Sequence, residues 1–269
     1  MIIFAAQRIL IMVYKPLEQS EYDDIASRIL YEDNHILIIN KKVGEIVQGD
    51  KTGDEPLSET LKAFIAQRDD KPGHVFIGVP HRLDRPVSGI AMFAKTSKGL
   101  ERLNEAFRTG DVHKHYYALV CAKPEPESGE LADWLVRNEK MNKSFVTKSP
   151  ANAKDSGYRD DVACGSILRH SATGDNGAQK AVLRYKLAKS FDRYWLVDVE
   201  LLTGRHHQIR CQLAAHGWVI KGDLKYGAKR SNPDGGISLH AHSVTFTHPV
   251  SKKDITVTAP VHWPPFIDE

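Results

Sequence analysis

The sequence predicts an α+β protein with a mixed, largely antiparallel central sheet and flanking helices. Three observations favour this class: strand-like runs outnumber helical segments, no clean βαβ repeat occurs, and no low-complexity linker or fixed-period repeat divides the chain. The 269 residues, of which 41% are hydrophobic and 26% charged, suffice for a sizeable core. We therefore expect one domain over residues 21–269, preceded by an N-terminal extension over residues 1–20.

The first half of the chain contains alternating strand and helix signals. Residues 35–40 (HILIIN) form an apolar run typical of a buried strand, and they follow the turn-like EDN. Residues 56–67 begin with a proline and carry apolar side chains at a helical period. Residues 90–95 (IAMFAK) predict a further strand. Thr96 is then a good N-cap for a helix that should stop at Gly110.

The second half continues the same mixed order. Residues 115–120 (HYYALV) and 194–202 (YWLVDVELL) are rich in β-branched and aromatic side chains, which favour strands. Residues 205–217 (RHHQIRCQLAAHG) predict a helix with His216 on its apolar stripe and Gly217 as its C-terminal stop.

Charge and cysteine content point to a cytoplasmic protein with an anionic partner. The formal net charge is only +3, weaker than that of a typical DNA-binding module, although thirteen histidines add charge below neutral pH. Cys121, Cys164 and Cys211 are few, odd in number and without metal spacing, so we expect reduced core thiols in the cytoplasm.

The N-terminal run MIIFAAQRILIMVYK is apolar but too short for a membrane span, with Arg8 in its middle. It lacks the cleavage site of a signal peptide. Either it is an extension ahead of Met12, or it packs on the domain as a strand or helix. No membrane association is expected.

Several common site chemistries find no motif in the chain. Neither GxGxxG nor GxxxxGK[ST] occurs, so no nucleotide cofactor is expected, and no GxSxG surrounds Ser88. Three histidine pairs raise the question of a metal: His113 with His115, His206 with His207, and His240 with His242. No HExxH, HxE or CxxC motif accompanies them, and no acidic third ligand stands at a familiar spacing. We expect no metal site and no cofactor.

One carboxylate stands out from its neighbours. Asp84 lies between Arg82 and Arg85 in HRLDRPVSGI. A surface aspartate near arginines is usually an ordinary ion pair that contributes little. The stretch alone therefore does not decide whether Asp84 faces solvent or a substrate.

HRLDRPVSG (residues 81–89) resembles the HRLDxxTSG signature of the RluA-type pseudouridine synthases. Four further blocks are similar to family patterns in the same order: YEDNHILIINKKVG (31–44) to the strand and NKPxG segment, HKHYYALVCA (113–122) to KxYxAxVxG, ELLTGRHHQIRCQLAAHGWVIKGDLKYG (200–227) to LxTGRTHQIRxHLxxxGxPIxGDxxYG, and LHAHSVTFTHP (239–249) to LHAxxLxFxHP. The resemblance covers roughly residues 28–265.

The chain departs from the family pattern at a few positions: Val87 replaces threonine, Lys42 proline, His206 threonine, and Cys211 and Gln212 valine and histidine. None of these is the expected acid, tyrosine or arginine. The resemblance therefore still implies the pseudouridine synthase catalytic fold and its chemistry.

That chemistry breaks the N-glycosidic bond of a uridine within RNA, turns the base and rejoins it through C5, without a cofactor. An ionised carboxylate suits it as nucleophile or electrostatic partner, and the resemblance assigns this role to Asp84. It also places Arg210 in a salt bridge with Asp84, which favours the ionised form. Tyr116 is expected to stack on the flipped uracil and to move the C5 proton, while Tyr117 alternates to the opposite face of its strand.

RNA, ribosomal or transfer, is the expected partner, bound through its backbone and a loop with a flipped uridine. We expect a monomer. Leu202 is expected to wall the base pocket. The other RNA-binding candidates are Arg82, Arg85, Lys114, Arg205, His207, Lys140 and Lys143. The basic run over residues 137–148, which also contains Arg137 and Lys148, equally fits an ordinary solvated face.

Two rival functions remain open from the sequence. One is a catalytically idle RNA-binding protein or RNA chaperone of the same fold, which an intact Asp84, Tyr116 and Arg210 argues against. The other is a different carboxylate enzyme, such as a glycosidase. That class normally needs two acids flanking the bond, and no second carboxylate stands out near Asp84 in the sequence.

Overall fold

A computed structural model describes residues 14–50, 52–147, 177–261 and 263. Within them the strands are β1 (Ile29–Glu32), β2 (Ile36–Lys41), β3 (Ser88–Ala94), β4 (Val112–Val120), β5 (Ser128–Asn138), β6 (Lys143–Thr147), β7 (Gln179–Ser190), β8 (Trp195–Leu201), β9 (Leu239–Thr247) and β10 (Asp254–Thr258). The helices are α1 (Gln19–Arg28), α2 (Leu57–Arg68), α3 (Ser97–Thr109), α4 (Gln208–Ala215) and the short 3₁₀ helix η2 (Leu224–Tyr226).

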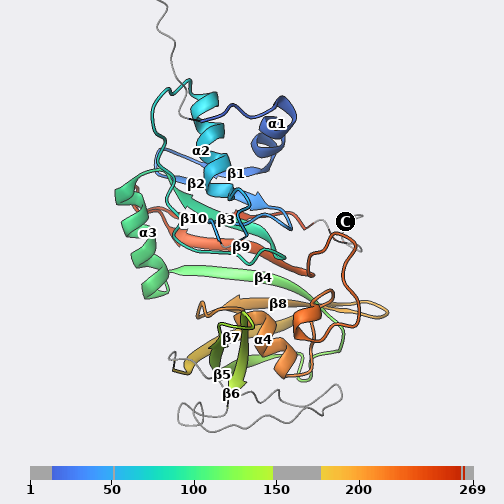
Figure 1. The fold of residues 1–269 in the computed structure, drawn as a ribbon. Helices are drawn as coiled ribbons and strands as arrows, with labels where there is room; N and C mark the ends of the chain where they lie inside the picture. Colours follow the sequence, from blue (N-terminus) through green and yellow to red (C-terminus); the bar gives the residue numbers. More distant parts are fainter. Residues whose placement is uncertain (1–13, 51, 148–176, 262, 264–269) are drawn as a thin grey trace, which may run out of the picture.

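The ten described strands form one sheet in the order β1-β2-β3-β9-β4-β8-β7-β5-β6, with β10 also pairing β9 (Figure 1). Every strand pairing is antiparallel except that between β3 and β9. The predicted α+β class with a mixed, largely antiparallel sheet is therefore confirmed.

The single parallel contact depends on a glycine. Ser88 and Gly89 pair with His240 and Ala241, so β3 meets β9 over two residues only. Gly89 has φ +108°, and a Cβ atom there would lie 2.4 Å from the carbonyl oxygen of Ala241. Only glycine allows so close a backbone approach, and this contact holds the N-terminal strands against the rest of the sheet.

Most predicted elements form where the local pattern placed them. The 35–40 run forms β2, which is buried on both faces, and α2 begins directly after Pro56. Thr96 caps α3 by accepting from the Gly99 N–H, and Gly110 ends this helix in the left-handed conformation. The main core lies between these elements and the central strands.

The helix predicted over residues 205–217 is shorter than expected. It begins at Gln208 because His207 adopts a left-handed conformation, with φ +52°. The Gln208 side chain accepts from the Arg205 N–H, so the residues before the helix form a turn. His216 lies past the last turn and is exposed, so its assignment to the apolar stripe was wrong.

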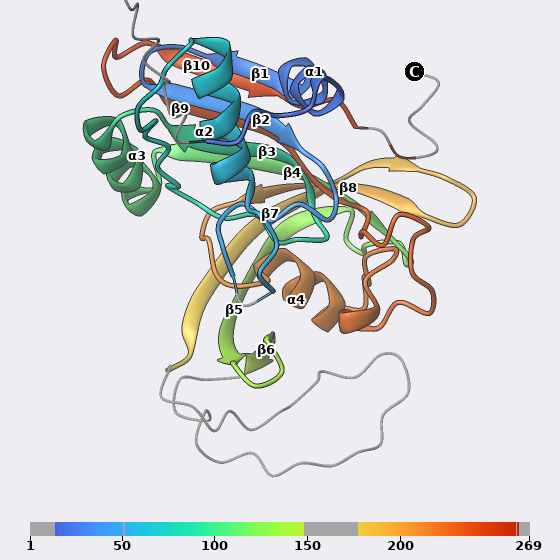
Figure 2. The ribbon, with the colours of Figure 1, turned by 45° about the horizontal axis from the view of Figure 1, so that its top comes forward.

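Helix α4 packs against β5, β6 and η2 at the far end of the sheet from α1 and α2, as Figure 2 shows. A second, smaller core cluster formed by Leu135, Ala181, Cys211 and Tyr226 lies there. Cys211 is thus a core thiol as predicted, whereas Cys121 is exposed, and Cys164 lies outside the described residues.

The N-terminal prediction is only partly within reach of the structure. Residues 1–13 lie outside the described part of the chain. Helix α1 begins at Gln19, so the expected boundary after residue 20 would fall in its first turn; the boundary stays a prediction. In the described ranges, no helix has the length and apolar character needed to cross a membrane.

Candidate active site

Asp84 lies on the loop that leads into β3. The Val87 N–H donates to the Asp84 carbonyl at 3.0 Å, and the Ile237 N–H donates to the Pro86 carbonyl at 3.0 Å. Val87 is buried in the core. These contacts fix the loop at both strand β3 and the segment before β9, which gives Asp84 a defined position.

Two polar side chains that the sequence did not single out anchor the same loop. Lys41, 1% exposed, donates from Nζ to the carbonyl oxygens of Lys42, Glu45 and Arg85. Burial lowers the pKa of Lys41 to about 8. His81 accepts from the Met92 N–H through Nε2, and burial lowers the pKa of His81 to about 4. It therefore stays neutral near pH 7.

Neither arginine beside Asp84 in the sequence pairs with it. Arg85 forms an exposed ion pair with Asp54 at 2.6 Å. Arg82 is exposed and forms no ion pair with any described residue. Neither forms an ion pair with the Asp84 carboxylate.

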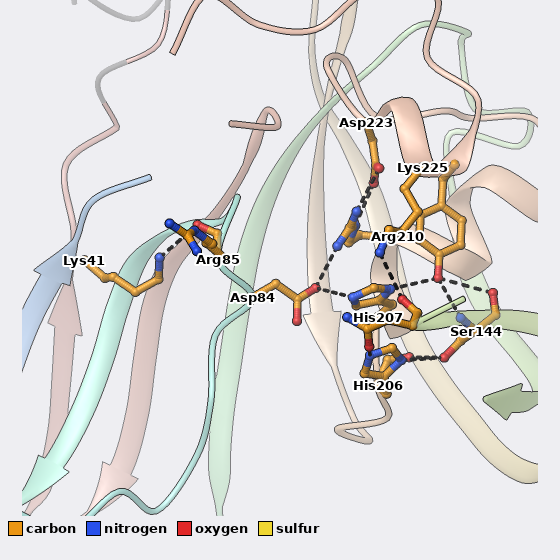
Figure 3. A network of polar contacts seen from close by, with 11 residues as sticks. Lys41, Asp84, Arg85, Ser144, His206, His207, Arg210, Asp223 and Lys225 are labelled. Carbon is orange, nitrogen blue, oxygen red and sulfur yellow. Dashed lines mark hydrogen bonds and ion pairs between the residues drawn. The ribbon is translucent and has the colours of Figure 1, made fainter. Parts of the chain in front are cut away.

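The partner of Asp84 is Arg210 on α4, as the resemblance implied. Arg210 Nη1 donates to Asp84 Oδ2 at 3.1 Å (Figure 3). The sequence did not reveal a second and closer partner: Arg210 Nε and Nη2 donate to the two carboxylate oxygens of Asp223 at 2.7 and 2.9 Å. Arg210 is 5% and Asp223 1% exposed. Burial alone would lower the pKa of Arg210, but the two carboxylates raise it.

A neutral imidazole completes the contacts of Asp84. His207 Nε2 lies 3.5 Å from Asp84 Oδ2, and its Nδ1 lies 3.1 Å from the Tyr226 hydroxyl (Figure 3). Burial and the charge of Arg210 lower the pKa of His207 to about 2. His207 was expected to contact RNA; the structure shows it buried, between Asp84 and Tyr226.

His206, a departure from the family pattern, joins the site to the β5–β6 turn. Its ring stacks on His207 with centroids 3.8 Å apart. Nδ1 contacts the Ser144 hydroxyl at 2.9 Å and Nε2 contacts Asn142 Oδ1 at 3.1 Å. Burial and the charge of Arg137 lower the pKa of His206 to about 4. The stacked pair is therefore uncharged at neutral pH.

Tyr116 projects from β4 and is 8% exposed. Burial and the negative charge of Asp84 raise its pKa, so the two side chains are electrostatic neighbours and the phenol keeps its proton. Tyr117 lies on the other face and stacks on His242 at 4.1 Å. Lys114 was expected at the RNA surface, but it is half-buried, with Nζ 5.6 Å from the centroid of the Phe107 ring, and burial lowers its pKa.

The remaining predicted RNA contacts are spread around the site. Leu202 is an exposed apolar residue, with 36% of its surface accessible. Arg205 is exposed, and its Nε donates to the Lys180 carbonyl. Lys140 is exposed on the β5–β6 turn. Lys143 is not a free surface lysine, because its Nζ lies 4.9 Å from the centroid of the Tyr226 ring. Lys148 lies outside the described residues.

The histidine pairs that raised the question of a metal have other contacts. His115 pairs with Asp198, and Nδ1 of His240 contacts the Ser88 hydroxyl. His242 Nδ1 contacts the Ala259 carbonyl. No group of three or more metal-ligating side chains is present within the residues that the structure describes.

The residues that sequence reasoning missed lie inside the blocks that carried the resemblance. Asp223 and Tyr226 belong to GDLKYG, and Lys41 belongs to NKKVG. The motif match was therefore a signal of their importance. It did not give their roles, because a pattern of letters does not show which side chains share a buried arginine.

Comparison with known proteins identifies the chain's relatives. The family model for RNA pseudouridylate synthases matches residues 35–215. Ribosomal large subunit pseudouridine synthase C of Vibrio cholerae is 30% identical over 90% of this chain and 68% of its own length. Ribosomal large subunit pseudouridine synthase D of Xanthomonas campestris is 29% identical over 88% of this chain and 67% of its own.

Solved structures agree on the fold. Human RNA pseudouridylate synthase domain containing 4 superimposes with a TM-score of 0.69 over 91% of this chain and 92% of its own, at 22% identity. Human RNA pseudouridylate synthase domain containing 1 has a TM-score of 0.64 over 95% and 89%, at 19% identity.

The arrangement around Arg210 generates a stability prediction. Arg210→Ala leaves Asp223 as a buried, uncompensated charge, and we expect a loss of ~3–5 kcal/mol in the free energy of unfolding. Adding Asp223→Asn should restore more of it than adding Asp84→Asn, because Asp223 is 1% and Asp84 32% exposed. Urea unfolding of the three variants measures this. Greater rescue by Asp84→Asn would contradict the assignment of Asp223 as the main partner.

The neutral imidazoles generate a pH prediction. The folded state holds His207 uncharged down to about pH 2, whereas an unfolded histidine binds a proton near pH 6.5. The unfolded state thus binds more protons below pH 6.5. As the pH is lowered below 6.5, this residue should therefore reduce the free energy of unfolding by up to ~1.36 kcal/mol per pH unit. His207→Gln should flatten the fall between pH 6.5 and 4 in urea titrations. His113→Gln, at an exposed position of β4, is the matched control; parallel curves for wild type and His207→Gln would refute the explanation.

Proposed function

This chain belongs to the RNA pseudouridylate synthase family, and we propose that it converts uridine to pseudouridine in ribosomal RNA with Asp84 as the catalytic carboxylate. The chain is an RluA-type enzyme of the isomerase class. The relatives named as ribosomal large subunit synthases support ribosomal RNA as the substrate. Transfer RNA is the other substrate class expected from the resemblance.

The observation that carries the catalytic assignment is the contact pattern of Asp84. Oδ2 is bound by Arg210 and lies near His207, and no described residue forms a hydrogen bond or ion pair with Oδ1. The side chain is 32% exposed, so one oxygen is held and the other is open to a substrate. The Arg210 guanidinium balances the negative charge that a carboxylate carries when it acts as a nucleophile or electrostatic partner. Oδ1, the open oxygen, would approach either the ribose or the base.

Tyr116 is proposed as the second catalytic residue. Tyr116 lies on β4, and burial and the charge of Asp84 raise its pKa. Stacking of its ring on an extruded base would be worth ~1–3 kcal/mol. Because its raised pKa keeps the hydroxyl protonated, Tyr116 would act as a relay: as its oxygen takes the C5 proton, the hydroxyl gives its own proton to an acceptor, water or the Asp84 carboxylate. Leu202 is proposed as an apolar wall of the same base pocket.

The target uridine must leave its stack to reach Asp84, because the glycosidic bond is inaccessible inside a helix. The exposed side chains Arg82, Arg205 and Lys140 are proposed to bind the RNA backbone, together with Arg85 once it exchanges Asp54 for a phosphate. Lys114 is buried enough that a contact to RNA would require it to leave the Phe107 ring. A monomer and a cytoplasmic location remain predictions.

The two rival functions fare differently against these observations. The relatives are named as synthases, which argues against an idle RNA-binding protein. The structure contains the second carboxylate that the sequence did not reveal, but Asp223 is 1% exposed and both its oxygens accept from Arg210. It is therefore unsuited to act as the second acid of a glycosidase.

Pseudouridine mapping tests the proposal directly. Cells lacking the gene should lose pseudouridine at defined positions of ribosomal RNA, and the purified protein should restore it in transcripts of that RNA. Asp84→Asn should abolish restoration and change RNA affinity only a few-fold, because the substitution keeps shape and removes charge. An unchanged map, or turnover by a clean Asp84→Asn preparation, would overturn the proposal; loss confined to transfer RNA would reassign the substrate.

Tyr116→Phe separates stacking from proton transfer. The ring remains, so RNA affinity should stay within a few-fold of wild type, while the proton leaving C5 loses its acceptor. We expect RNA to bind and product release to stall, which single-turnover kinetics with quantification of bound and free product would detect. Near-normal turnover would reduce Tyr116 to a wall of the pocket.

A further inference from the structure

Three cations from three elements gather beside the stacked histidines. Arg137 on β5, Lys143 on β6 and Lys225 on η2 lie around His206, His207 and Tyr226, and we name these three cations the cationic wall. Their proximity shows in the electrostatics: the charges of Arg137 and Lys225 lower the pKa of both histidines, after the larger effect of burial.

Direct contacts fix two of the three cations in place. Lys225 Nζ donates to the Asn142 carbonyl at 3.1 Å, and the Asn142 side chain contacts His206 at 3.1 Å. Lys143 Nζ lies 4.9 Å from the centroid of the Tyr226 ring, whose hydroxyl contacts the imidazole next to His206. Lys225 and Lys143 are thus connected, through Asn142 and His206 and through Tyr226, to His207, which lies next to Asp84.

The charge of the wall has no counter-charge in the described part of the chain. None of its three side chains forms an ion pair with a described carboxylate, whereas Arg210 has two such partners. The Nε atom of Arg137 is buried without a hydrogen-bond acceptor. Burial lowers the pKa of Lys143; the charges of Cys211 and Asp223 oppose this shift, and those of Lys225 and Arg210 add to it. Such crowding of like charges is relieved when an anion binds among them.

We propose that the cationic wall is a binding site for one phosphodiester group of the RNA strand, next to the nucleotide that enters the site. The proposal rests on the proposed function, because it takes RNA as the anion. Its position supports this choice: His206 stacks at 3.8 Å on His207, which lies 3.5 Å from Asp84. A strand that delivers its uridine to Asp84 must place a neighbouring phosphate close by. The Arg137 guanidinium offers paired donors that match phosphate oxygens, and the two ammonium groups add charge.

Salt dependence of binding tests the site without requiring turnover. The probe is a fluorescently labelled 12-nucleotide oligouridylate, titrated with the full chain at several KCl concentrations. Arg137→Gln/Lys143→Gln/Lys225→Gln should lower the slope of log affinity against log salt by about 2, because each cation that neutralises a single strand adds about 0.7 to that slope. Lys225→Gln alone should lower the slope by about 0.7. Because Lys225 is exposed, this single variant should stay folded, and it provides the test if the triple variant does not fold.

A matched control removes the same charge elsewhere. Lys71→Gln/Arg108→Gln/Lys123→Gln neutralises three exposed cations, each already paired with a carboxylate. This variant should keep the wild-type slope. Equal slopes for both triple variants would mean that net charge alone sets binding, and an unchanged slope for the wall variants would remove the wall from the interface; either result overturns the proposal.

Replacing single phosphodiester groups of the RNA by uncharged linkages identifies the one that the cationic wall binds. Using a short RNA that contains the mapped uridine, single methylphosphonate linkages are placed in turn on each side of it. One position next to the uridine should weaken binding by wild type and have no further effect on the triple wall variant. Equal weakening of both proteins at every position would refute a specific site. Because only binding is measured, failure to form pseudouridine would refute the proposed function and leave this result interpretable.

Discussion

The buried ion pair between Arg210 and Asp223 determines the arrangement of the other site residues. A charge at 5% exposure is tolerated only with full compensation, and Asp223 supplies it through both carboxylate oxygens. The remaining nitrogen, Nη1, donates to Asp84. Helix α4 and the turn before η2 must therefore be correctly packed before Asp84 has its partner. The Asp84 carboxylate is partly exposed, but its environment is set by a pair in the core.

Much of the fold followed from local patterns. The buried strand at 35–40, the helix after Pro56 and the capped helix after Thr96 all formed, because apolar periodicity and capping act within a few residues. The start of α4 could not be predicted this way. The predicted first turn is absent because His207 adopts a left-handed conformation. In this position the His207 ring contacts Asp84 and Tyr226, and helix propensity does not predict such long-range contacts.

The site was predicted less completely than the fold. Arg210 and Asp84 are 126 positions apart, and only the resemblance linked them. Asp223 lies 13 positions from Arg210 inside a matched block, yet a sequence does not show which acid becomes buried. Lys143 was expected to be a surface cation, but the ring of Tyr226 holds it at the site, because the β5–β6 turn folds back onto α4. Burial and long-range pairing, not residue type, decide these roles.

Local charge around Asp84 is determined as much by groups kept neutral as by ions. His207 and His206 together would carry two positive charges if protonated, in competition with Arg210 for the same carboxylate. Burial and the neighbouring cations prevent this, since both imidazoles remain neutral far below pH 7. Arg210 is therefore the cation that touches Asp84, with a fixed charge. The pairing of Asp84 with Arg210 is thereby separated from the titration of the histidines around it, and their stacked rings connect Asp84 to Asn142 in the β5–β6 turn.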